Sequence, residues 1–474
     1  MATTAQKQLI RNENDYNLNY VKLVDWSGKE LDFQQHVGEF TYEESIFETF
    51  LHGSVFVSDA VDFTTLLPLM GQERFKASFT RPDENPPPGS DGRLLDPIAF
   101  DMCVYLMDGK RQESGSGKHQ TYTLYYTSEE IFKNLNTKVF KALRGKTYSE
   151  IVELVYNSYL KVGKKLVVEE SNIEVDYCIQ NEHPIRAINK MAKRAVPKTP
   201  VTTSAAEEDK PTSNGYFYVF YEDRDQFNFV SVGSLIKKAP VAKLTYELKN
   251  IMENTSGLSH KSRDIVKDMS NVSNYQQQGT FDVLSQAMSG EATSSMLALD
   301  PILRSYSVKE FDLRKEFDKF PHVDKAKSFV DNHRMFVSPT ANMSMIIGDS
   351  THASNDYIKS RDTSVKTHLP EEFLLHRQSQ KKQMLKNIIT ATLSGNPRIK
   401  AGSMIEFAIP EHLGKTSQNN PEQKDQYLQG KYLVVSVAHI LRIGQYTMNL
   451  ELIKDTYFSD IKRRDPIEEY KNIY

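Results

Sequence analysis

The sequence predicts a mainly β protein with α/β insertions. The main observation is the stretch from Asn387 to Asp455, in which apolar and polar residues alternate along four segments separated by turns. A second region of alternating segments runs from Tyr20 to Tyr126. Helical spacing is confined to shorter stretches elsewhere. Antiparallel strands with one apolar face must pack against another layer or close into a barrel, so we expect two sheet-rich regions with apolar cores.

Each strand of the C-terminal stretch has a recognisable boundary. The first ends at Ser394-Gly395-Asn396-Pro397, because Gly and Asn supply unusual backbone angles and Pro cannot donate to a ladder. Pro410 closes the second strand, and Gly444-Gln445 turns the third strand into the fourth. The four predicted strands are 388–393, 405–409, 431–441 and 446–453.

The N-terminal region is predicted to contain strands, a hairpin and one short helix. His52-Gly53 joins two strands, and Asp59 or Asp62 is expected to cap a helix over 63–70. The prolines within 81–97 exclude helix and ladder and predict a loop. The predicted strands are 20–25, 39–50, 54–58, 74–80, 98–107 and 120–126.

Two helices are predicted next. Thr147 and Glu150 form a capping box at the start of a helix over 147–160. Pro184 suits the first turn of a second helix, which ends near Ala195. We interpret the aromatic and Met side chains of both helices as core rather than as a cofactor site.

The middle of the chain gives weaker patterns. Arg224-Asp225 is predicted to be the turn of a hairpin, and residues 253–300 are interpreted as an extended, partly helical connection. Residues 306–319 are expected to lie along a neighbouring surface. The remaining expected elements are strands at 216–220, 227–232, 242–252 and 344–347 and a helix at 371–386.

Composition limits the possible classes of function. The chain has 474 residues, of which 26% are charged, and a net charge of −3, so composition excludes a general nucleic-acid binder. No secretory apolar core and no run of 18 apolar residues is found, which predicts no secretion signal and no membrane span. Cys103 and Cys178 are expected to be free buried thiols, since no pattern supports a disulfide or zinc.

No residue pattern indicates catalysis, cofactor binding or metal binding. His439 is interpreted as structural, because catalysis and metal binding need converging partners. Glu222 and Asp223 are adjacent on a strand and point to opposite faces, so we interpret them as solvated turn charges rather than a glycosidase pair. Gly117-Lys118 lacks the remainder of a phosphate-binding loop and is expected to be a flexible hairpin tip. The sequence therefore predicts no site residues and no cofactor.

Three segments resemble the central baseplate hub proteins of contractile-tailed bacteriophages, those of T-even type in particular. The first two are FTYEESIFETFLHGSVFVSD and GYFYVFYEDRDQFNFVSVGSLI. The third is the C-terminal pattern that runs from Ser394-Gly395-Asn396 through Gly430–Val434, His439 and Tyr446 to Lys454-Asp455. Type VI secretion spike proteins share this last barrel. Residues 253–368 match nothing in the pattern.

The resemblance implies two tube-like antiparallel β-barrel domains with inserted helical and mixed domains. Residues 18–145 plus 216–240 would form the first barrel domain, and 241–252 plus 387–458 the second. A helical insertion, 146–215, includes a linker at 196–215, and 253–386 is a mixed insertion. Residues 1–17 are expected to be a flexible N-terminus and 459–474 a C-terminal tail.

The resemblance also implies a structural, non-enzymatic role. A homotrimeric ring would adapt a hexameric tail tube or tube-initiator protein above to a trimeric spike below, and DNA would pass through its lumen without specific binding. Further expected partners are other baseplate wedge proteins and a tape measure, and no membrane partner is expected. The implied location is the tail baseplate of a virion assembled in the bacterial cytoplasm.

Two alternatives remain open. A ring of six chains would favour a tail-tube initiator or a component of a bacterial contractile injection system. A tail-associated cell-wall hydrolase would need paired carboxylates or a Cys/His pair in a cleft.

Overall fold

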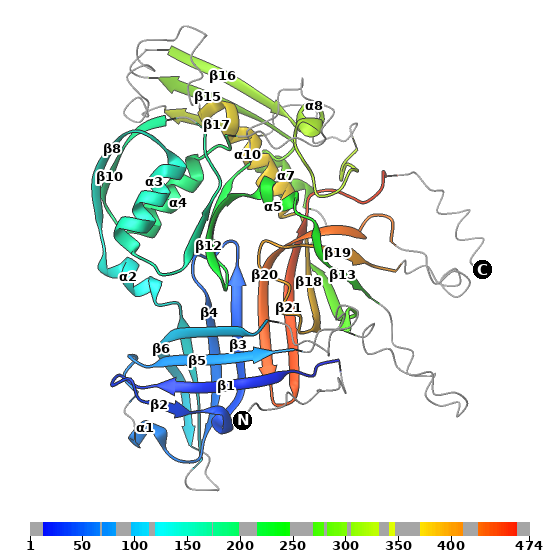
Figure 1. Ribbon diagram of the computed structural model, residues 1–474. Helices are drawn as coiled ribbons and strands as arrows, with labels where there is room; N and C mark the ends of the chain where they lie inside the picture. The colour runs from blue at the N-terminus through cyan, green and yellow to red at the C-terminus, as the bar shows by residue number, and fades with distance from the viewer. Residues whose placement is uncertain are drawn as a thin grey trace, which may run out of the picture.

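The computed structural model confirms a mainly β fold with helical insertions (Figure 1). Predictions for the linker, for Gly117-Lys118 and for most of the two termini fall outside the described residues. The described residues are 13–66, 69–81, 96–112, 119–172, 174–198, 216–246, 269–278, 282–300, 305–330, 341–346, 370–410 and 425–461.

Six strands of the C-terminal region close into a barrel. Their hydrogen-bonded order is β13-β19-β20-β21-β18-β14. The ring closes where the amide of Thr245, at the end of β13, donates to the carbonyl of Ser270, just before β14, at 3.1 Å. The strands are β13 (Pro240–Thr245), β14 (Val272–Gln278), β18 (Asn387–Ser394), β19 (Met404–Ala408), β20 (Gly430–Arg442) and β21 (Gln445–Lys454).

The interior of this C-terminal barrel is filled by apolar side chains. The inward residues alternate along each strand, as the sequence predicts, and they include Ile389, Phe407, Tyr432 and Leu450. One pairing differs from the antiparallel expectation, because β13 runs parallel to β19. The two strands are separated by a long stretch of chain, which leaves room for a parallel connection.

The N-terminal region forms a strongly curled sheet that continues the same hydrogen-bonded ladder. Its order is β3-β4-β7-β6-β5-β1-β2, and β1, β5 and β6 cross over β3 and β4 (Figure 1). The side chains between the crossing layers form an aromatic core that includes Phe40, Phe75 and Tyr126. The strands are β1 (Asn17–Val24), β2 (Glu30–Asp32), β3 (Val37–Ser45), β4 (His52–Asp59), β5 (Arg74–Thr80), β6 (Ile98–Gln112) and β7 (Gln120–Thr127).

The short helix α1 (Phe63–Leu66) starts where the sequence predicts a cap. Both candidates contribute: the Asp59 carboxylate accepts the amides of Val61, Asp62 and Phe63 at 2.8–3.0 Å, and the Asp62 carboxylate accepts the Thr64 hydroxyl at 3.0 Å.

The first insertion packs two helices against small sheets. The predicted capping box of Thr147 and Glu150 is confirmed at the start of α3 (Tyr148–Val155), which ends in a π-helical turn, Tyr156–Leu160. Pro184 starts α4 (Pro184–Arg194), as predicted. The pair formed by β8 (Val139–Thr147) and β10 (Glu174–Glu182) is not among the predicted strands. The short α2 (Glu130–Asn136) precedes them.

The predicted hairpin is β11 (Tyr218–Glu222) and β12 (Gln226–Ser231), followed by α5 (Val232–Ile236). The resemblance implies that this hairpin belongs to the first barrel domain. In the structure β12 pairs with β9 (Lys165–Val168), and Phe220 and Phe227 join the core formed with α3 and α4. The face of the hairpin that carries Phe220 and Phe227 is buried against these helices, so the hairpin packs as part of the first insertion.

The second insertion contains regular structure that the sequence analysis interpreted otherwise. Residues 306–319, expected only to lie along a neighbouring surface, form regular structure within the chain. The strand β16 (Ser305–Asp312) pairs with β15 (Thr293–Asp300), within the expected connection, and the predicted strand β17 (Ala341–Ile346) joins them. These strands pack on α10 (Pro370–Met384), the helix predicted at 371–386. The remaining elements are α7 (Val283–Met288), α8 (Leu313–Glu316) and a 3-10 turn at Phe317–Lys319.

Gly53 provides a test of the contact between β3 and β4. A Cβ at this position would overlap the carbonyl oxygen of Thr41 and lie 2.6 Å from the Tyr126 ring. We expect Gly53→Ala to lower the melting temperature by several degrees, through an overpacking cost of about 1–3 kcal/mol or more. Gly163→Ala is the matched control, because its Cβ would meet nothing within 4 Å. Equal melting temperatures for the two variants would contradict the packing described.

Candidate functional site

The functional geometry centres on β20, which is shared by the two strand systems. Its first half pairs with β19, for example Leu433 with Met404. Its second half pairs on the same edge with β3, from Ser436 with Ser45 to Arg442 with Glu39. The opposite edge pairs with β21 almost throughout. We call the stretch where β20 pairs with β3 the seam.

The β20–β21 hairpin contributes to both cores. Val437 and Met448 lie in the interior of the C-terminal barrel, whereas Leu441 and Tyr446 belong to the aromatic core of the N-terminal sheet. The Tyr446 amide also donates to the carbonyl of Asn14 at 3.0 Å, which joins the segment before β1 to the hairpin tip. The two strand systems therefore cannot separate without breaking one hairpin.

His439 lies on β20 within the seam and is the packed, hydrogen-bonded residue that the sequence predicts. Only 1% of it is exposed, and Nδ1 lies 2.7 Å from the Tyr446 hydroxyl. Burial, with a smaller contribution from the positive charge of Arg224, lowers the pKa of His439 to about 3. The ring is therefore neutral at physiological pH, and it serves the packing of the seam.

The turn between β11 and β12 carries charges that the sequence analysis expected to be solvated, and that expectation is wrong. Glu222 is 1% and Asp223 is 6% exposed. Glu222 accepts the Leu51 amide at 3.2 Å and pairs with Lys164 at 2.5 Å. Asp223 instead accepts amides of its own turn. The two carboxylates therefore have separate partners, Glu222 at the end of β11 and Asp223 within the turn.

The same turn contacts the C-terminal barrel. Arg224 donates to the carbonyl of Pro397 at 2.5 Å, and Asp225 forms an ion pair with Lys400. The Glu222 amide donates to the carbonyl of Thr49 at 3.0 Å. One turn thus joins the first insertion, the N-terminal sheet and the C-terminal barrel.

Glu44, on β3 within the seam, is a buried acid that the sequence interpretation did not single out. Its carboxylate accepts the Tyr42 hydroxyl at 3.0 Å and the Ala401 amide at 3.2 Å. Burial and the negative charge of Asp223 raise the pKa of Glu44 to about 7, although Arg224 partly offsets them. The sequence contains a signal for this burial, because Glu44 lies an even number of residues from the buried Phe40 and Tyr42 and therefore on the same face of the strand.

A second group of buried charges fixes the second insertion to the end of β21. His322 Nδ1 lies 2.6 Å from Asp455, which also accepts the Val323 amide at 3.0 Å. Lys454 pairs with Asp324 at 2.6 Å. Burial would lower the pKa of His322, but the Asp455 carboxylate outweighs it and raises the pKa. Both pairs have each charge matched, as buried charges require.

Other residues considered for chemistry do not converge. Cys103 and Cys178 are partly exposed free thiols on β6 and β10. Met191 and Tyr156 are buried in the core of the first insertion, as predicted. Among the described residues no group of three or more His, Cys, Asp or Glu is arranged to hold a metal ion. Within the same residues no helix is long and apolar enough to cross a membrane.

Glu44 makes the stability of the seam dependent on pH. Its pKa rises from 4.5 to about 7 on folding, so its stabilising contribution is complete below pH 4.5 and is lost as the pH rises through 7. This difference corresponds to about 3 kcal/mol. We expect Glu44→Gln to remove this loss. The melting temperature of the variant, relative to that of the native chain, should therefore be higher at pH 8.5 than at pH 5.

The control is Glu153→Gln, because Glu153 is exposed on α3. Thermal unfolding of the three proteins across this pH range checks the prediction. If the melting temperatures of Glu44→Gln and of the native chain changed equally with pH, this result would contradict the assignment of a buried carboxyl that holds its proton.

Comparison with known proteins gives a likeness of fold. No family model matches the chain, and no curated protein matches it. The tail protein from Neisseria meningitidis MC58 aligns with a TM-score of 0.51 at 10% identity, covering 94% of this chain and 100% of that one. The 43 kDa tail protein of prophage MuSo2 from Shewanella oneidensis aligns with a TM-score of 0.50 at 9% identity, covering 92% and 98%. At such low identity the similarity concerns the fold, so this chain has the fold of phage tail proteins.

Proposed function

We propose that this chain is the structural hub of a contractile phage tail baseplate. The observation that carries the proposal is the continuous ladder through β20, which fuses two strand systems into one unit. The likeness to two tail proteins over more than nine-tenths of the chain supports a structural role in a tail.

In this proposal each chain contributes two tube-like units to a ring of three chains. The C-terminal barrel has a solid apolar interior, so a channel would run between barrels of different copies rather than through one. Three chains with two units each give approximate sixfold symmetry. Such a ring would match a hexameric tube or tube initiator on one side and a trimeric spike on the other.

The proposed role is mechanical rather than catalytic. The buried carboxylates of the described residues are held by structural partners: Glu44 by Tyr42 and Ala401, and Asp455 by His322. Rigid attachment of both insertions to the barrel suits a part that transmits load. We further propose wedge proteins and a tape measure as partners, DNA passage without specific contacts, and a place in the virion baseplate after assembly in the host cytoplasm.

The oligomeric state tests this proposal. We expect native mass spectrometry and particle images to show trimers of the 54.3 kDa chain with an open centre, either alone or with the spike protein added. A ring of six chains would reject the hub in favour of a tail-tube initiator or an injection-system component. Monomers in both samples would also reject it.

A further inference from the structure

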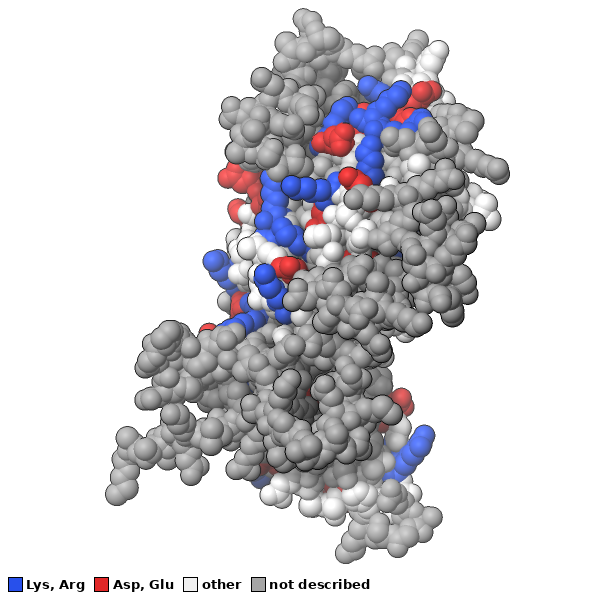
Figure 2. Space-filling model, turned by 90° about the vertical axis from the view of Figure 1, so that its right-hand side faces the viewer, with Lys and Arg blue, Asp and Glu red and all other residues white. Residues whose placement is uncertain are grey.

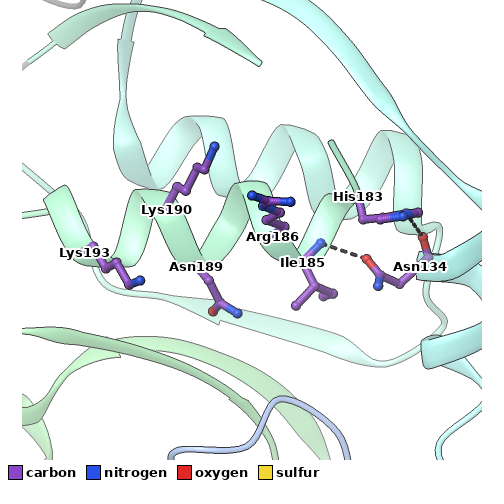
Figure 3. A pocket seen from close by; sticks show the side chains of 7 residues that line it. All are labelled: Asn134, His183, Ile185, Arg186, Asn189, Lys190 and Lys193. Atoms are coloured by element: carbon purple, nitrogen blue, oxygen red, sulfur yellow. Dashed lines mark hydrogen bonds between the residues drawn. The ribbon is translucent and has the colours of Figure 1, made fainter. Parts of the chain in front are cut away.

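A basic face on α4 is the feature of the first insertion that the hub proposal leaves unused. Arg186, Asn189, Lys190 and Lys193 follow one another along this helix and border a hollow of about 460 Å³. Figure 3 shows these side chains along α4, with Asn134 of α2 and His183 at its N-terminal end. Residues i, i+4 and i+7 lie on one side of a helix, so Arg186, Lys190 and Lys193 form a row about 10 Å long.

The charge of this row is only partly neutralised. Residues 183–198 contain Lys and Arg but no Asp or Glu. Lys190 pairs with Glu182 of the neighbouring β10, whereas Arg186 and Lys193 have no carboxylate partner among the described residues. Both side chains are exposed. The row therefore keeps an excess positive charge in a chain whose net charge is −3.

Arg186 is placed against the local energetics of the helix. It lies in the first turn of α4, where the helix dipole favours an acid and disfavours a cation by about 0.3–1 kcal/mol. No acidic residue occupies that turn. Lys193 has a local explanation, because cations suit a helix C-terminus, but Arg186 has none. A residue that opposes its own element is a reason to look for a role outside that element.

The surroundings distinguish this face from ordinary mixed surface. On the face of the molecule in Figure 2, the described Lys and Arg side chains lie among Asp and Glu side chains. On α4 the neighbours of the basic row are two amides, an apolar side chain and one acid, Glu182, which is paired with Lys190. Asn134 and Asn189 line the hollow, and Ile185 lies beside them. Amide donors and an apolar contact suit a peptide that carries carboxylates on short side chains.

We propose that this face of α4 binds an acidic segment of a partner protein, with carboxylates on successive turns or alternate residues facing Arg186, Lys190 and Lys193. Complementary charge selects the occupant, and the hollow beside the helix receives its backbone. The proposal is independent of the number of chains in the assembly.

Fluorescence anisotropy with the full chain tests this site. The probe is a labelled twelve-residue peptide rich in Glu and Asp, compared with the same peptide carrying Gln and Asn. We expect salt-sensitive binding of the acidic peptide only. The double variant Arg186→Glu/Lys193→Glu should weaken this binding about tenfold or more. Each substitution removes one exposed ion pair with the peptide and places a negative charge against its carboxylates. Arg186→Gln/Lys193→Gln should give a smaller loss without new repulsion.

The matched control is Lys141→Glu/Arg144→Glu, which reverses two exposed charges on β8 of the same insertion, outside the hollow. Equal weakening in both double variants would overturn the proposal, because it would show a general charge effect. A twelve-nucleotide single strand that binds as tightly, with the same sensitivity to Arg186 and Lys193, would overturn it in favour of nucleic acid.

A last variant addresses the chain's own linker, which contains Glu207, Glu208 and Asp209. The triple variant Glu207→Gln/Glu208→Gln/Asp209→Asn removes these charges. If it bound the acidic peptide tenfold more tightly, the linker would be identified as the occupant of the α4 face, and the proposal of a partner protein would be overturned. An unchanged affinity for the peptide would support a segment of a partner protein as the occupant.

Discussion

The double use of β20 is the constraint on which the rest of the structure depends. This strand changes partner on one edge, from β19 to β3, while it keeps β21 on the other. The change requires a local irregularity, which is found as a register shift against β21 between Val434 and Ser436. At that point the Val435 carbonyl accepts the amide of Ile46, just beyond β3, at 2.9 Å. The bulge bends the strand out of one curved sheet and into the other.

The sequence of β20 reflects this division. Tyr432, Leu433, Val434 and Val435 are all buried, because Tyr432 and Val434 face the barrel interior and Leu433 and Val435 face the core under α5. Beyond the bulge the pattern returns to alternation, with His439 and Leu441 buried. Polar contacts then fix each insertion to this frame, partly exposed ones at the first insertion and a buried ion pair at the second. The β11–β12 turn binds the loop at Pro397–Lys400, and His322 binds Asp455 next to the end of β21.

Elements with a local signal could be predicted from the sequence. The capping box of Thr147, the alternation of β18 and the turn at Gly444 each depend on neighbouring residues, and the structure has them where expected. The pairing of β13 with β19 and the layer joined by β11 and β12 depend on distant contacts, which no local pattern contains. The burial of Glu222 and Asp223 likewise arises only when three parts of the chain meet. The sequence contains a signal for the basic row on α4, namely Arg186 in the first turn of the helix. The interpretation of this helix considered only its apolar face, as part of the core.

Hydrogen exchange along β20 in the native protein tests the central claim most directly. If the strand unites the two systems, the amides of 432–434 in the barrel and 437–441 in the seam should open together and show similar protection. Exchange of the seam half well ahead of the barrel half, without loss of protection in β19 and β21, would contradict the account, because it would show that the N-terminal sheet detaches as a separate unit.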